Sequence, residues 1–107
     1  MEKFRASAEI TWSRPALEIH NLVRAVAPPF PGAFGNVEGE RWEIHRTRLS
    51  LDTPVPRGGT LFGAAGRCYL ACGDGRALRL LAAVNARGAV DLAALAARAA
   101  QRPLPLS

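Results

Sequence analysis

The strongest constraint on the fold is a run of three prolines within four positions, at Pro28, Pro29 and Pro31. Proline fixes its own φ, lacks a backbone donor and pushes the preceding residue towards extended geometry, so no helix can continue through this run. The sequence has a different periodicity on each side. Apolar residues recur every three or four positions before the prolines and every second position after them, which predicts a helix followed by strands.

Residues 13–27 are predicted to form an amphipathic helix that stops at the prolines. Ser13 can accept a hydrogen bond from the first free N–H groups, and Pro15 is tolerated in the first turn because its missing donor would be unpaired anyway. His20 and Asn21 fall on the exposed polar face of this helix. The apolar residues at three- and four-residue spacing are Ala16, Ile19, Leu22, Val23 and Val26.

The segment 28–32 is predicted to be a rigid turn rather than a flexible linker. A flexible tether is rich in Gly and Ser, whereas here Phe30 lies between prolines and Phe34 follows shortly after. These apolar side chains are expected to hold the segment against an internal or an external surface. At the other end of the helix, residues 1–12 form a lead-in that ends in an alternating run compatible with an edge strand.

Residues 33–84 alternate between apolar and polar positions, with turn signals roughly every eight to twelve residues, as in small β-sandwiches and barrels. In the longest predicted strand, Trp42 and Ile44 share one face, whereas Leu49 has the opposite parity. A bend or bulge is therefore expected near Arg46-Thr47. Bends of this kind close small barrels.

Two turns and a second helix complete the predicted fold. Glu38-Gly39-Glu40 predicts one hairpin, and Asp74-Gly75 between two apolar strands predicts another. Residues 91–102 are predicted to form the second helix, capped by Asp91 and stopped by Pro103. The result is one domain of 107 residues. It is mainly β with flanking helices (α+β): a small open β-barrel preceded by one amphipathic helix and followed by a short C-terminal helix.

The composition indicates a basic chain with free thiols. A formal net charge of +5 favours a polyanionic partner, because clustered cationic side chains displace counterions from phosphates. Cys68 and Cys72 would lie about 13 Å apart in one strand. That separation is too large for a disulfide. Two cysteines without a second pair of ligands do not indicate a zinc site. We therefore expect two half-buried thiols in a reducing compartment. No apolar run is long enough for a membrane span and no secretory signal is recognisable, so a cytoplasmic location without membrane association is expected.

No catalytic, cofactor-binding or metal-binding constellation is recognisable. His20 and Asn21 diverge on the helix, and His45 has no second His, Cys or paired carboxylate at ligand spacing. Asp74 is explained by turn chemistry, and the glycines form neither a strand-GxGxxG-helix unit nor a Walker loop. We therefore expect no enzyme activity from the chain alone and no cofactor.

The arginines are the remaining functional candidates. Arg46 and Arg48 share one strand face, and Arg41 is assigned to the other face together with Thr47. A barrel that presents arginine and aromatic side chains on one face is a known platform for a nucleic-acid backbone. The alternative, a solvated surface without a ligand, stays open. The predicted nucleic-acid-binding residues are Arg41, Arg46, Arg48, Arg67 and Arg79.

Several stretches of the sequence resemble a known family. Residues 10–16 (ITWSRPA), 19–25 (IHNLVRA) and 29–34 (PFPGAF), followed by residues 71–80 (ACGDGRALRL), resemble the C-terminal domain of the formyltransferases. That family includes methionyl-tRNA formyltransferase and the nucleotide-sugar (4-amino-arabinose) formyltransferase. The resemblance implies an open barrel similar to an OB fold, preceded by a helix.

The same resemblance implies that the chemistry belongs to another domain. In the family, an N-terminal α/β domain transfers the formyl group from a folate donor with an Asn-x-His motif, a downstream Asp and a Ser-Leu-Leu-Pro loop, and none of these occurs here. We therefore expect a non-catalytic accessory domain that positions substrate or packs against a separate α/β catalytic domain, in cis or in trans. The expected docking residues are Arg24, Pro29, Phe30, Pro31, Gly32 and Phe34.

A second hypothesis treats the chain as a stand-alone basic OB-like domain that binds tRNA or another nucleic acid. The resemblance implies two uses of the domain: the tRNA enzyme holds the acceptor arm with it, and the sugar enzyme frames its substrate cleft with it. Residues 26–34 look slightly more like the sugar-type enzymes. Both hypotheses stay open at the level of the sequence.

Overall fold

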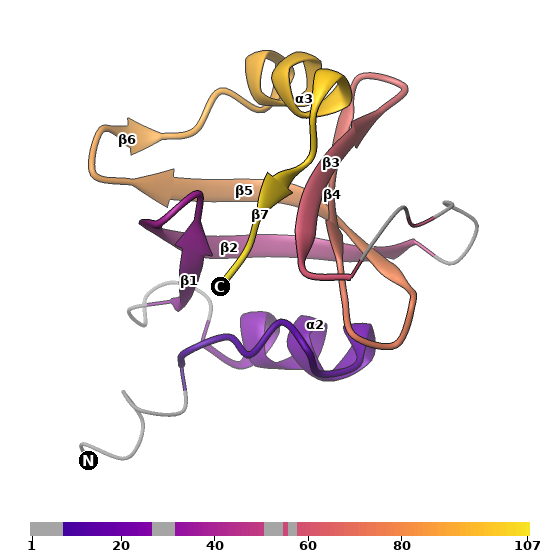
Figure 1. The fold of residues 1–107 in the computed structure, drawn as a ribbon. Coiled ribbons are helices and arrows are strands. Elements are labelled where there is room, and N and C mark those ends of the chain that lie inside the picture. The colour runs from indigo at the N-terminus through magenta and orange to yellow at the C-terminus, as the bar shows by residue number, and fades with distance from the viewer. Residues whose placement is uncertain (1–7, 27–31, 51–54, 56–57) are drawn as a thin grey trace.

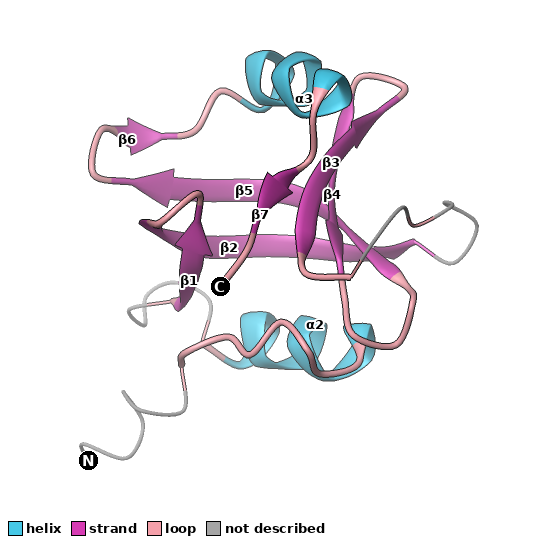
Figure 2. Cartoon of the chain, in the orientation of Figure 1, coloured by secondary structure: helices cyan, strands magenta, loops and turns pink. Residues whose placement is uncertain are grey.

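A computed structural model describes residues 8–26, 32–50, 55 and 58–107, which form a mainly β domain with two helices (Figure 1, Figure 2). This confirms the predicted fold class. The helices α2 and α3 lie on opposite sides of the barrel (Figure 1). The elements in chain order are α2 Ala16–Ala25, β1 Ala33–Val37, β2 Glu40–Ser50, β3 Thr60–Ala64, β4 Arg67–Ala71, β5 Ala77–Asn85, β6 Gly88–Ala89, α3 Leu92–Gln101 and β7 Leu104–Pro105.

The strands form an antiparallel sheet in the order β1-β2-β5-β4-β3-β7, with β6 added beside β5. The two ends of this sheet meet. Leu106 bridges to Val37, and Ser107 and Asn36 exchange two backbone hydrogen bonds of 3.0 Å. Residues 8–10 cover the remaining edge of β1 through backbone bonds to Phe34. The sheet is therefore a nearly closed barrel, in which strand edges that would otherwise be open are paired.

The closing strand β7 lies outside the range 33–84 that the sequence predicts for the barrel. A two-residue strand that contains Pro105 leaves no period-two signal. β7 is defined by its partners Thr60 and Leu61 in β3, which are far away in the sequence. Closure of the barrel is therefore a tertiary property that the local pattern does not reveal.

The longest strand, β2, contains the predicted irregularity. Its pairing with β5 shifts register between Ile44 and Arg46 and again between Arg46 and Thr47. The buried face of β2 passes from Ile44 to Thr47 over His45 and Arg46, and β5 spans the same number of residues between their partners Ala83 and Leu80. The assignment of Thr47 to the same face as Arg41 is therefore wrong, because Thr47 is buried and Arg41 is exposed.

The helix α2 begins later than predicted, at Ala16, because Pro15 keeps extended geometry with φ −61° and ψ 149°. Ser13 consequently lies before the helix and does not cap it. Instead, Asp74 in the turn between β4 and β5 accepts a hydrogen bond of 3.2 Å from the backbone N–H of Ala16. The neighbouring Gly73 lies so close to the chain that a Cβ there would be 1.8 Å from the carbonyl oxygen of Ser13.

The second helix, α3, follows the prediction closely. Asp91 accepts hydrogen bonds from the backbone N–H groups of Ala93 and Ala94 at 3.1 and 3.2 Å, which satisfies free donors of the first turn. The buried side of α3 lies directly on β3, where a Cβ at Gly63 would be 2.1 Å from the carbonyl oxygen of Ala96. The small residues of α3 therefore allow a close backbone approach.

The main hydrophobic core of the described residues fills the barrel and extends under both helices. Cys68 and Cys72 belong to it as free thiols and are more deeply buried than predicted. Burial raises the pKa of Cys68 to about 11, and burial together with the charge of Asp74 raises the pKa of Cys72 to about 12. Both thiols are therefore poor nucleophiles at neutral pH. Within the described residues, no helix combines the length and the apolar character needed to cross a bilayer.

Candidate functional site

Four of the described arginines gather on the outer side of the barrel, and this set is termed the arginine face: Arg46, Arg48, Arg67 and Arg79. The irregularity in β2 determines the position of the first two, because Thr47 is buried between the exposed Arg46 and Arg48. Arg67 begins β4 and Arg79 lies within β5. Arg79 is flanked by the buried Leu78 and Leu80, and the exposed Arg67 precedes the buried Cys68, so both side chains project away from the core.

The sheet register makes these arginines neighbours. Arg48 of β2 lies directly opposite Arg79 of β5, and Arg79 lies directly opposite Tyr69 of β4. Directly opposed residues have Cβ atoms about 4.5–5.5 Å apart, and diagonal neighbours are about 7–8 Å apart. Arg67 is diagonal to Arg79 by this register, and Arg46 is two residues from Arg48 on the same strand. The predicted residues 46, 48, 67 and 79 are thus brought together.

The charge of the arginine face is not neutralised within the described part of the chain. None of its members has an acidic partner at ion-pair distance there. Four acidic side chains are engaged elsewhere, in contacts with Arg14, His45, Arg87 and Arg98. Like charges placed directly opposite across strands destabilise a sheet, so the pair Arg48–Arg79 opposes folding.

The fifth predicted nucleic-acid-binding residue, Arg41, lies apart from the others. Its guanidinium carbon is 4.0 Å from the centroid of the Phe34 ring, and its backbone is opposite Asn36 of β1. Five residues of extended strand separate Arg41 from Arg46, a distance of about 17 Å. Arg41 is therefore occupied by a cation–π contact rather than placed with the arginine face.

The structure describes only some of the predicted docking residues. Pro29, Phe30 and Pro31 lie outside the described residues. Gly32 has φ +94° and lies against the His45 ring, and Phe34 is half-buried beneath Arg41. The remaining predicted docking residues do not form one described patch, since Arg24 is exposed near the end of α2.

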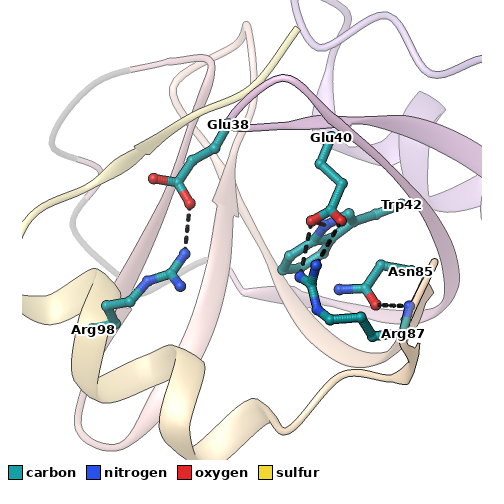
Figure 3. Close-up of polar contacts among 6 residues, drawn as sticks. All are labelled: Glu38, Glu40, Trp42, Asn85, Arg87 and Arg98. Carbon is teal, nitrogen blue, oxygen red and sulfur yellow. Dashed lines mark hydrogen bonds and ion pairs between the residues drawn. The ribbon is translucent and has the colours of Figure 1, made fainter.

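A cleft of about 300 Å³ opens between the β1–β2 hairpin, the β5–β6 turn and α3. Figure 3 shows its polar contacts: Arg98 reaches Glu38, and Arg87 donates two hydrogen bonds, of 3.0 and 3.1 Å, to Glu40. The Trp42 indole also donates to Glu40 at 3.1 Å, and these hydrogen bonds lower the pKa of that carboxyl. The two ion pairs tie the β1–β2 hairpin to the β5–β6 turn and to α3.

The histidines and acids of the described residues do not form a reactive centre. His20 is half-buried rather than exposed as predicted, because its Nδ1 lies 2.7 Å from the Thr47 hydroxyl in the barrel. Burial, and secondarily the charge of Arg24, lower the pKa of His20. Among the described residues, no group of three or more His, Cys, Asp or Glu side chains could hold a metal ion.

Comparison with protein families adds the decisive observation. A family model described as the formyl transferase C-terminal domain matches residues 4–98. The chain belongs to this family. The match confirms the resemblance carried by residues 10–34 and 71–80, and it supports an accessory domain of formyltransferases.

Sequence reasoning missed two features of this formyltransferase C-terminal domain. The direct opposition of Arg48 and Arg79 depends on the pairing of β2 with β5, which is irregular between Ile44 and Thr47. The ion pair Arg98–Glu38 joins residues 60 positions apart. Alternation could place Arg48 on an outer face, but only the strand pairing shows which arginines are neighbours.

Proposed function

We propose that this formyltransferase C-terminal domain is a non-catalytic accessory domain that positions a nucleic-acid substrate for a separate α/β catalytic domain. The arginine face carries the proposal, because neighbouring guanidinium groups that have no acidic partner among the described residues attract a polyanion. Each guanidinium presents a planar fork of donors that matches the oxygens of a phosphate. The favoured ligand is tRNA.

Titration of labelled tRNA at two salt concentrations tests this proposal. If all members of the arginine face contact phosphates, log K should fall with log[salt] with a slope of roughly −3 to −4. Absence of binding at low salt would end the proposal.

Two variants that remove the same charge distinguish binding by the arginine face from a general effect of net charge. Arg79→Gln should weaken tRNA binding several-fold and make the salt slope less negative by about 1. Arg102→Gln removes the same charge at the end of α3 and should leave both quantities nearly unchanged. Urea unfolding should show that Arg79→Gln is at least as stable as the parent, because it relieves the repulsion from Arg48. An equal loss of binding in Arg102→Gln would show that net charge alone is responsible.

Packing against the catalytic domain is the second candidate, and Leu17 favours it. This side chain is 53% exposed on α2, and Arg24 lies two turns along the same side of the helix. Leu17→Ser, Arg24→Gln and Phe30→Ala should each weaken association with a formyltransferase catalytic domain supplied as a separate chain. Leu17→Ser should leave stability unchanged within about 0.5 kcal/mol, because the site is exposed. Unchanged association in every variant would remove this candidate.

A further inference from the structure

We infer that residues 8–12, termed the edge segment, bind an extended segment of a partner protein that carries a lysine or arginine and adds to the barrel as a further strand. An outermost strand presents a row of unpaired N–H and C=O groups, and such a row pairs readily with another chain. This surface is separate from the arginine face, which lies on β2, β4 and β5.

The edge segment covers β1 with the backbone groups of Ala8 and Ile10. The Ile10 N–H donates to the Phe34 carbonyl at 2.7 Å, and the Phe34 N–H donates to the Ala8 carbonyl at 3.0 Å. Glu9 is the residue bridged to Phe34 in this parallel pairing, so its own N–H and C=O point away from β1. Neither group has a hydrogen-bond partner among the described residues. Glu9 therefore offers one donor and one acceptor to an added strand.

The exposed Glu9 carboxylate determines which partner fits this edge. Within the described ranges it is the only acidic side chain without a hydrogen-bond or ion-pair partner. The others contact basic side chains or accept backbone hydrogen bonds: Glu18, Glu38, Glu40, Glu43, Asp74 and Asp91. A residue directly opposite Glu9 in an antiparallel pair projects from the same face, where an opposite charge stabilises the pairing. A lysine or arginine is therefore favoured there. A second copy of the chain is disfavoured, because each copy has a net charge of +5.

Two hollows adjoin the edge segment, and Glu9 lines both of them. One hollow, of about 420 Å³, lies against α2 and includes Ile19 and Leu22. The other, of about 550 Å³, extends to Gly59 and Leu106. Successive side chains of an added strand alternate between its two faces, so the neighbours of the basic residue can enter these hollows. The apolar side chains that line them favour aliphatic neighbours.

An NMR titration of the isotope-labelled chain with synthetic peptides tests the inference. The peptide acetyl-Val-Thr-Val-Arg-Val-Thr-Val-amide is compared with the same peptide carrying Glu in place of Arg, and with one N-methylated at the Arg. The signals of residues 8–12 should move on binding, and exchange of the Glu9 N–H with solvent should slow about tenfold, because a new hydrogen bond protects it. The Glu peptide should bind about fivefold more weakly. The N-methylated peptide should not bind measurably, since it has no donor for the Glu9 carbonyl.

Charge variants of the chain give the second part of the test. Glu9→Arg should reverse the preference, so that the Glu peptide binds about fivefold more tightly than the Arg peptide. Glu38→Gln, which removes a negative charge from the β1–β2 hairpin, should keep the original preference, and Arg79→Gln should leave peptide binding unchanged. Unmoved signals of residues 8–12 at millimolar peptide, or an unchanged preference in Glu9→Arg, would overturn the inference. Signals of the edge segment that move with protein concentration in the absence of peptide would assign the edge to a second copy and would overturn it as well.

Discussion

Replacement of Gly73 by alanine should disrupt the junction between α2 and the barrel. A Cβ at this position would lie 1.8 Å from the carbonyl oxygen and 2.3 Å from the carbonyl carbon of Ser13. These are backbone atoms, so no side-chain rotation relieves the clash. The segment before α2 would have to move away by roughly 1.5–2 Å to reach van der Waals distance.

That displacement breaks two hydrogen bonds, and their loss accounts for part of the expected fall in the free energy of unfolding. The Gly73 N–H donates to the Arg14 carbonyl at 3.1 Å, and Asp74 caps Ala16 at 3.2 Å. A backbone hydrogen bond contributes about 1 kcal/mol net, and a helix N-cap contributes about 1 kcal/mol. Strain from overpacking adds about 1–3 kcal/mol. We therefore expect the free energy of unfolding to fall by about 3–5 kcal/mol.

Urea unfolding followed by tryptophan fluorescence measures this effect, since Trp12 is buried beside Ser13. Gly75→Ala is the matched control: Gly75 has φ +78° and open space around it, so only backbone strain of about 1–2 kcal/mol is expected. Asp74→Ala should cost about 1 kcal/mol alone. Combined with Gly73→Ala it should add almost nothing, because the cap is already lost. A Gly73→Ala protein as stable as Gly75→Ala would refute the reasoning.

Two further changes test local features of the fold. Ala65 has φ +52° in the exposed β3–β4 turn, so Ala65→Gly should raise the free energy of unfolding by about 1 kcal/mol, measured by urea unfolding. Ala97→Gly, on the exposed side of α3, should lower it by about 1 kcal/mol, because glycine disfavours the helix interior. His20 has a folded-state pKa below its usual value of 6.5, so the unfolded chain binds the proton more readily and stability should fall as the pH drops below 6.5 towards that lowered pKa. Urea midpoints at several pH values should show this fall in the parent and a smaller one in His20→Asn; equal pH dependence in both proteins would contradict it.

The sequence predicts those parts of the fold that depend on neighbouring residues. The hairpin at Glu38-Gly39 forms because both residues adopt positive φ, at 53° and 79°, as a two-residue hairpin turn requires. Asp91 caps α3 because the acceptor and the free N–H groups lie within three positions. The change of parity between Ile44 and Leu49 predicts a bend or bulge, and the pairing of β2 with β5 is irregular between Ile44 and Thr47.

Contacts between distant residues account for the parts that the sequence does not predict. Ala16 is capped by a residue 58 positions away, and the local signal at Ser13 points to the wrong residue. The Trp12 indole donates to the carbonyl oxygen of Ser107 across 95 positions. The arginine face depends on strand pairing in the same way, because alternation cannot show that Arg48 faces Arg79.

The residues that carry the family resemblance meet at one junction, although they are far apart in the sequence. A Cβ at Gly35 would be 2.8 Å from the Trp12 ring, and a Cβ at Gly73 would be 1.8 Å from the carbonyl oxygen of Ser13, so the lead-in to α2 contacts both β1 and the β4–β5 turn. These residues determine how the helix meets the barrel. Three members of the arginine face lie outside the resembling stretches, and only Arg79 lies within them. The fold and the proposed polyanion binding therefore depend largely on different residues. A relative with the same junction but without arginines at positions 46, 48 and 79 should keep the barrel and lose affinity for nucleic acid.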